Sequence, residues 1–149
     1  MSRKSFLAHA RLWAPPFVTM LVIFYLSSES NPLPEVTTRV WDKLLHASEY
    51  GTLAWLFCRA ITGEGYGRLA VMALAFVFTS AYGASDEWHQ SFVPLRNSSI
   101  YDWLADSIGA GAGIAAFTAI DLALHGRAHD RPTTNRAPIE SRDIQSLDR

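Results

Sequence analysis

The feature that most limits the fold of this chain is the segment from Leu69 to Ser85, which contains no charged residue. An α-helix rises about 1.5 Å per residue and needs roughly 20 residues to cross about 30 Å of hydrocarbon. We therefore predict a membrane-spanning helix over residues 69–92, which continues into the polar residues after Ser85 and stops before Pro94. The composition agrees, because 49% of the residues are hydrophobic and only 18% are charged, against roughly 25% charged in soluble domains.

Residues 12–28 and 43–61 are predicted as two earlier spans. The Pro-Pro pair at 15–16 lies near the start of the first span, where a missing backbone N–H is tolerated. The second span begins after Asp42, a suitable helix cap, and charged residues and a histidine interrupt its apolar pattern. Alone it would fail a hydropathy criterion, but it can cross a membrane if its polar face points into a bundle.

The last predicted span covers residues 101–124. The segment Ser99-Ile-Tyr-Asp102 matches the Ser-x-x-acid pattern that opens helices. Gly109 and Gly113 are four residues apart, and this small-xxx-small spacing lets membrane helices approach closely. The expected fold class is therefore an all-α membrane protein with a four-transmembrane-helix bundle.

The distribution of cations predicts which side of the membrane each connection faces. Lys and Arg residues gather before the first span, between the second and third spans, and after the fourth. This bias places both termini in the cytoplasm. We expect one membrane domain over residues 1–125, and the Arg-, Asp-, Ser- and Pro-rich residues 126–149 have the composition of a disordered tail.

With this topology, the polar residues of three spans and one loop fall at the same, extracytoplasmic end. Those that share a helix recur at helical spacing, so they lie on common faces. Unpaired charges inside a membrane are costly, and we expect these side chains to meet in one recess, with the acids paired to Arg96, Lys43 and the two histidines. The predicted binding set is Asp42, Lys43, His46, Tyr50, Asp86, Glu87, His89, Gln90, Arg96, Asp102 and Asp106.

Two segments carry a family resemblance. DKLLHASEYGTLAWLF (42–57) and SDEWHQSFVPLRNSSIYDWLADSIGAGAG (85–113) resemble the VanZ-like family of small bacterial membrane proteins. The likeness runs from the first span to about Ala116. The chain departs from the family pattern at Leu95, where glycine is common, and at Asp106, where asparagine is common.

This resemblance implies a multi-pass protein of the bacterial inner membrane. The family takes its name from a protein associated with low-level resistance to the glycopeptide teicoplanin. It brings no settled biochemical activity, so the resemblance informs fold and location more than chemistry.

The polar set admits several chemical interpretations. Asp86, Glu87 and Glu49 are candidates for general acid and base, and a structural salt-bridge cluster around Arg96 is the alternative. Arg96 and Lys43 could hold a phosphate, although neutralisation of nearby acids explains them better.

The remaining members of the set have simpler roles. Asp42 and Asp102 suit helix caps, and Tyr50 and Gln90 suit hydrogen-bond partners. We favour hydrogen-bonded histidines over a metal site, because metal-ligand spacing is missing from the sequence. No metal and no cofactor is therefore expected.

Two functions remain open. In the first, the protein acts at the cell envelope, binds a lipid-linked or wall precursor and modulates susceptibility to glycopeptides. In the second, it is a membrane hydrolase or transferase acting on a phosphate-bearing lipid. The expected surroundings are the lipid bilayer and an envelope precursor, and the chain has no broad basic face for nucleic acid.

Overall fold

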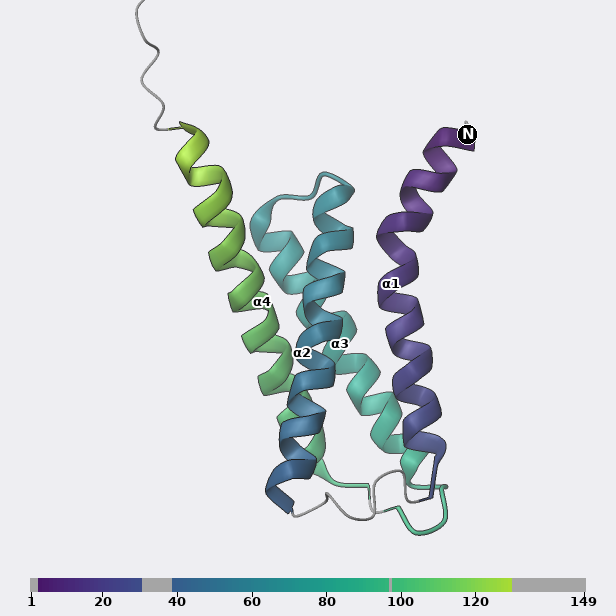
Figure 1. Ribbon diagram of the computed structural model, residues 1–149. Helices are drawn as coiled ribbons and strands as arrows, with labels where there is room; N and C mark the ends of the chain where they lie inside the picture. The colour runs from purple at the N-terminus through teal and green to yellow at the C-terminus, as the bar shows by residue number, and fades with distance from the viewer. Residues whose placement is uncertain (1–2, 31–38, 97, 130–149) are drawn as a thin grey trace, which may run out of the picture.

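The computed structural model describes residues 3–30, 39–96 and 98–129, with side chains for residues 7–30, 42–96 and 98–124. This part of the chain forms helices α1 (Arg3–Ser28), α2 (Arg39–Gly63), α3 (Arg68–Gln90) and α4 (Ile100–His129), shown in Figure 1. The predicted all-α class is confirmed for the described residues. Residues 31–38, between the first two predicted spans, the residue Asn97 and positions 130–149 of the predicted tail lie outside them.

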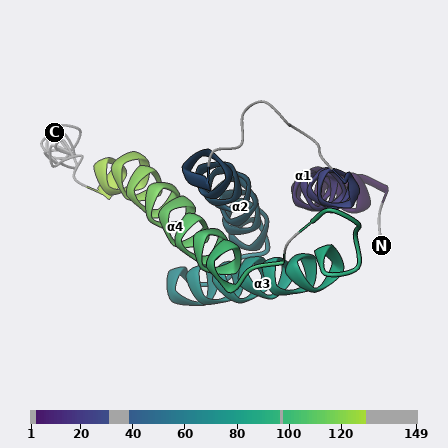
Figure 2. The same ribbon diagram turned by 90° about the horizontal axis from the view of Figure 1, so that it is seen from below.

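The four helices alternate in direction, so the start of α1 and the end of α4 lie at one end of the bundle (Figure 1). Seen along the bundle in Figure 2, α2 lies between α1 and α4, and α3 runs along one side of the bundle from α4 toward α1. Within the described residues, α1 and α4 each pack against α2 and α3 but not against each other. The opposite end of the bundle therefore brings together the end of α1, the start of α2, the end of α3 and the start of α4.

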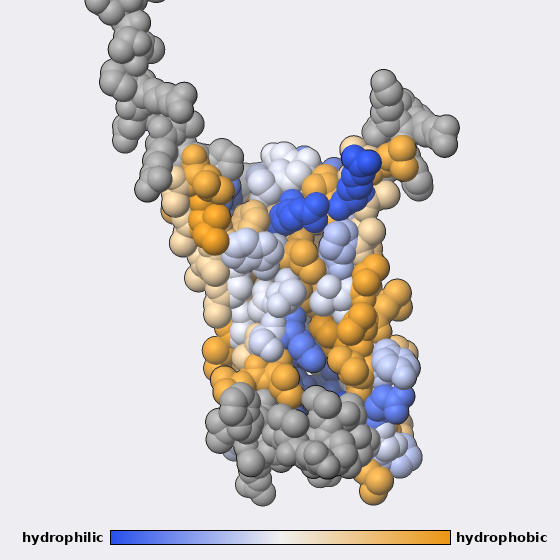
Figure 3. Space-filling model, in the orientation of Figure 1, coloured by the Kyte–Doolittle hydropathy of each residue, from blue (hydrophilic) through white to orange (hydrophobic). Residues whose placement is uncertain are grey.

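Three of the described helices are long and apolar enough to cross a membrane: Leu7–Ser28, Arg68–Gln90 and Ile100–Leu124. The α2 helix does not meet this criterion, as the sequence predicted. Figure 3 shows apolar side chains along both edges of one face of the molecule, over α1 and α4. These outer helices keep large apolar groups such as Leu21 and Ile108 exposed, which suits contact with lipid. The number of crossings and the side of each end stay predictions.

The prolines of α1 lie inside the helix, which corrects the prediction that they are near its start. Because α1 begins at Arg3, Pro15 and Pro16 are well past the first turn. Proline has no N–H to donate to the carbonyl four residues earlier, which leaves the Arg11 carbonyl without its helical partner. The Arg59 guanidinium from α2 donates to that oxygen at 3.2 Å, so α2 satisfies an acceptor that the proline releases.

Glycines on α4 allow close contact with α2. A Cβ placed on Gly109 would lie 2.1 Å from the Ala47 carbonyl oxygen, and one placed on Gly113 would lie 2.1 Å from the Gly51 carbonyl oxygen. Only the missing side chains let the two backbones come so near. The close approach predicted from the Gly109 and Gly113 spacing is confirmed.

Several helix ends differ from the prediction. Since α2 begins at Arg39, Asp42 lies within its first turn rather than capping it. At the start of α4 the Ser99 hydroxyl does act as a cap, accepting from the Tyr101 N–H at 3.2 Å. The α3 helix ends at Gln90, close to the predicted stop, and α4 extends to His129, beyond the boundary predicted at 125.

Candidate functional site

Three ionisable side chains from three helices meet at the end of the bundle away from the start of α1. One nitrogen of His46 on α2 and one carboxylate oxygen each of Glu87 on α3 and Asp106 on α4 lie within 4.8 Å of one another. His46 Nδ1 and Asp106 Oδ1 are 2.9 Å apart. Asp106 is fully buried and Glu87 is only 7% exposed. We call these three residues the inner cluster.

Each carboxylate of the inner cluster has one engaged and one free oxygen. Glu87 Oε2 accepts from the Ser99 backbone N–H at 2.7 Å, and Asp106 Oδ1 is paired with His46. Glu87 Oε1 and Asp106 Oδ2 are both buried and have no hydrogen-bond partner among the described residues. Buried acceptors without donors are uncommon in native proteins, so these two atoms point to a group that the described residues do not supply.

Gly83 and Tyr50 form the inner wall of the cluster. A Cβ on Gly83 would lie 3.0 Å from Asp106 Oδ2 and 3.2 Å from Tyr50 Cε1. Gly83 therefore leaves room for the buried carboxylate where α3 faces α4. Tyr50 is fully buried, and its hydroxyl interacts electrostatically with Asp86 without reaching hydrogen-bond geometry.

Asp86, the sequence neighbour of Glu87, has both oxygens occupied. Oδ1 accepts from the Ser27 hydroxyl at 2.6 Å, and Oδ2 accepts from Gln90 Nε2 at 2.9 Å. The contact with Ser27 joins α3 to the end of α1. Asp86 is thus better placed as a structural link than as the acid–base group the sequence proposed, and Gln90 has the partner role that we expected.

His89 and Arg96 face α1 rather than the inner cluster. The His89 ring stacks on Phe24 with centroids 4.6 Å apart, and its Nε2 lies 3.0 Å from the Ser28 hydroxyl. Arg96 donates from Nη2 to the Leu26 carbonyl at 3.0 Å and from Nε to the Ser27 carbonyl at 3.5 Å. The described contacts of Arg96 are therefore helix carbonyls, where the sequence predicted carboxylates.

A tight turn presents Arg96 to α1. The Arg96 N–H donates to the Val93 carbonyl at 3.2 Å, Pro94 occupies the second position, and Leu95 has φ 66°. These are the features of a type II turn, whose third position favours glycine. The chain keeps this turn with leucine at the position where the family commonly has glycine.

The rest of the predicted set surrounds the inner cluster. Lys43 forms an ion pair with Asp102, linking α2 to α4. The sequence predicted that Lys43 pairs with an acid but did not indicate Asp102, which we expected to be a helix cap. One carboxylate oxygen each of Asp42 and Asp102 lies within 4.8 Å of a His46 nitrogen. Glu49 is half-buried on α2, and its charge interacts with those of His46 and Asp106.

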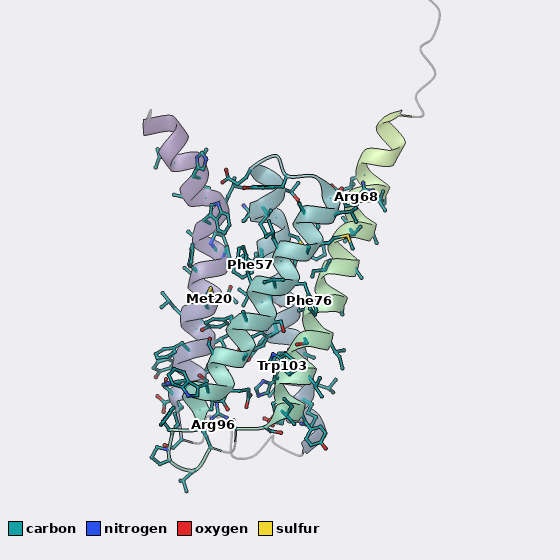
Figure 4. The ribbon with its side chains drawn as sticks, turned by 180° about the vertical axis from the view of Figure 1, so that it is seen from behind. Met20, Phe57, Arg68, Phe76, Arg96 and Trp103 are labelled. Carbon is teal, nitrogen blue, oxygen red and sulfur yellow. The ribbon has the colours of Figure 1, made fainter. Side chains whose placement is uncertain are left out.

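A hollow at the surface borders Glu87 of the inner cluster. It has a volume of about 340 Å³ and is lined by Ala84, Glu87, Ser98, Ser99, Ile100 and Trp103. Trp103 is held by a bond from its Nε1 to the Ser80 carbonyl at 3.1 Å. In Figure 4, Trp103 and Arg96 both lie toward this end of the bundle, with Arg68 at the other end.

Comparison with known proteins identifies the family. A family model described as VanZ/LLP1 matches residues 4–121. The chain belongs to the VanZ/LLP1 family. The match begins in α1 and ends in α4, so it contains the whole inner cluster, and it confirms the resemblance seen in the sequence. No curated protein and no solved structure matches the chain.

Three contributors to this VanZ/LLP1 site did not emerge from the sequence. Ser27 engages Asp86, the Ser99 N–H engages Glu87, and Gly83 makes room for Asp106. The signal for Ser27 was its place at the polar exit of an apolar helix. The sequence gives no such signal for the Ser99 N–H or for Gly83, because the role of a backbone N–H or of a missing Cβ depends on which group packs against it.

Proposed function

We propose that this VanZ/LLP1 protein is a multi-pass protein of the bacterial inner membrane, with both termini in the cytoplasm. In this proposal it acts at the cell envelope and binds the headgroup of a lipid-linked or wall precursor at the polar end of the bundle. The observation that carries the proposal is the inner cluster. Its buried oxygens of Glu87 and Asp106 lack described partners, and Glu87 borders a hollow open to the surface.

The available groups favour one kind of headgroup chemistry. Free carboxylate oxygens accept hydrogen bonds from hydroxyl and amino groups, which sugars and peptides of envelope precursors carry. Arg96 and Lys43, the cations suited to phosphate, are already engaged by α1 carbonyls and by Asp102. The sugar or peptide portion is therefore the better match to the site than the phosphate.

Mass spectrometry of co-purifying lipid tests this proposal. The full-length protein is extracted into lipid nanodiscs, and its bound lipids are compared with those of Glu87→Gln. Glu64→Gln is the matched control, because Glu64 lies at the connection between α2 and α3, bonded to Trp13 at 2.8 Å. We expect an envelope precursor to co-purify with the wild type and with the control, and to be depleted in Glu87→Gln. Equal amounts of precursor in all three proteins would refute the proposal.

The family association with teicoplanin supplies a cellular readout. Expression in a susceptible bacterium is expected to raise the teicoplanin concentration needed for growth inhibition, and Glu87→Gln is expected to abolish the rise. Matched protein levels, measured in the membrane fraction, are required for the comparison. Unchanged susceptibility with the wild type would argue against a glycopeptide-related role.

One observation favours the alternative, a membrane hydrolase or transferase acting on a phosphate-bearing lipid. Asp106 lies 2.9 Å from His46 Nδ1, an arrangement that orients an imidazole for proton transfer. His46 and Glu87 would then be the acid–base groups in place of Asp86. Incubation of the protein with lipid precursors discriminates the two functions, since only an enzyme converts the lipid to a product of different mass.

A further inference from the structure

We propose that the inner cluster binds one divalent transition-metal ion, Zn²⁺ or Mn²⁺, through His46, Glu87 and Asp106. This inference goes beyond the proposed function. The metal would take the two carboxylate oxygens that the headgroup would otherwise bond, and a headgroup oxygen would then bind at the open coordination position of the ion. The inference rests on the placement of the three side chains and on the two buried oxygens that have no described partner.

The first argument is the geometry of the donors. The three ligand atoms lie within 4.8 Å of one another and come from α2, α3 and α4. An ion about 2.1 Å from each donor in tetrahedral geometry holds the donors roughly 3.4 Å apart. Small side-chain rotations would close this difference. Since each donor is on a different helix, spacing along the chain does not indicate the site.

The second argument is that each carboxylate of the inner cluster has one buried oxygen without a partner among the described residues. Glu87 Oε1 and Asp106 Oδ2 are buried without a partner among the described residues, on side chains that are 7% and 0% exposed. Two carboxylates in such surroundings are costly unless paired with a cation. A divalent ion would satisfy both oxygens and neutralise both charges, whereas the neighbouring His46 carries one charge at most.

The third argument is that the inner cluster suits a metal better than the group next to it. Asp42, His46 and Asp102 also place ligand atoms within 4.8 Å, but Lys43 already pairs with Asp102. An ammonium on that carboxylate opposes a second cation. The inner cluster has no lysine or arginine contact among its described bonds, so its negative charge is the less compensated.

The chemistry of the donor set defines the kind of ion and its use. One imidazole with two carboxylates suits Zn²⁺ or Mn²⁺ more than Mg²⁺ or Ca²⁺, which prefer oxygen ligands. Three protein ligands leave a coordination position for water or a ligand oxygen, as in catalytic rather than structural zinc sites. Of the three ligands, Glu87 borders the surface hollow, so the open position would be reached from the side of Glu87.

Direct measurement of bound metal tests the proposal without reference to any lipid. The full-length protein in nanodiscs is treated with EDTA, dialysed, and incubated separately with Zn²⁺ and Mn²⁺, and retained metal is counted by plasma mass spectrometry. Asp106→Asn and Glu87→Gln remove one ligand each while keeping side-chain shape. Glu64→Gln is the control, and circular dichroism checks that each variant keeps its helices.

We expect about one ion per wild-type chain and per control chain. Each ligand variant should bind roughly 100-fold more weakly or worse, because even changes outside the ligand shell cost 10–100-fold. Absence of both metals from the wild type would overturn the site. So would folded Asp106→Asn and Glu87→Gln variants that retain as much metal as the wild type. If the variants do not fold, Co²⁺ titration of the wild type decides. Four-coordinate Co²⁺ in a protein site gives intense visible absorption bands, whereas aqueous Co²⁺ absorbs only weakly, so the absence of intense bands would overturn the proposal.

Discussion

Replacing Gly109 with alanine is the sharpest test of the packing that assembles the inner cluster. The new Cβ would lie 2.1 Å from the Ala47 carbonyl oxygen and 2.6 Å from the carbonyl carbon and Cα of the same residue. Side-chain carbons do not approach other atoms closer than about 3.0 Å. The clash is with the backbone of α2, which cannot rotate away, so α2 and α4 must separate by about 1 Å.

The expected loss of stability follows from this overlap. Overpacking a well-packed contact costs about 1–3 kcal/mol, and a rigid backbone neighbour places Gly109→Ala in the upper half of that range. For a chain of this size, the melting temperature falls roughly 2–4 °C for each kcal/mol. We therefore expect a decrease of about 4–12 °C. The same separation would lengthen the contact between His46 and Asp106, so metal binding should weaken as well.

The chain supplies both the assay and the matched control. Cys58 is the only cysteine and is fully buried, so the labelling of its thiol by a maleimide dye during heating reports unfolding in detergent. Gly111→Ala is the control, because a Cβ there meets no atom within 4 Å and alanine favours a helix over glycine. Equal melting temperatures for Gly109→Ala and Gly111→Ala would refute the packing argument.

The same labelling assay tests three further contacts with five variants. Ser27→Ala leaves a buried oxygen of Asp86 without its donor and should lower the stability by about 1–3 kcal/mol. Ser28→Ala is the control at an exposed site and should lower the stability by under about 0.5 kcal/mol. Equal effects would contradict the role of Asp86 as a link to α1. Leu95→Gly should stabilise the protein by about 1 kcal/mol because it relieves a left-handed conformation, and Leu95→Ala should not. Arg96→Gln removes the charged donors from the end of α1 and should cost about 1–2 kcal/mol; an unchanged melting temperature would show that this contact does not hold α1.

Local properties of the sequence were enough to predict the helices. The charge-free run of Leu69–Ser85 predicted the third helix, because apolar length alone determines whether a helix can cross a membrane. The spacing of Gly109 and Gly113 predicted a close helix contact, because glycines on one face let any neighbouring helix approach closely. Pro15 and Pro16 misled the prediction of where α1 begins, because the Arg11 carbonyl that a proline releases is satisfied by Arg59 from another helix.

The sequence by itself determined that ionisable residues would gather at one end of the bundle, because alternating helices bring their polar ends together. Only the tertiary structure decided which of those residues are free to act. Asp86 and Glu87 are adjacent in sequence, yet Asp86 is bonded to Ser27 of α1 and Glu87 faces His46 and Asp106. Successive side chains point in directions about 100° apart around a helix. Which groups two adjacent residues contact therefore depends on the helices packed on each side, and only the tertiary structure gives that arrangement.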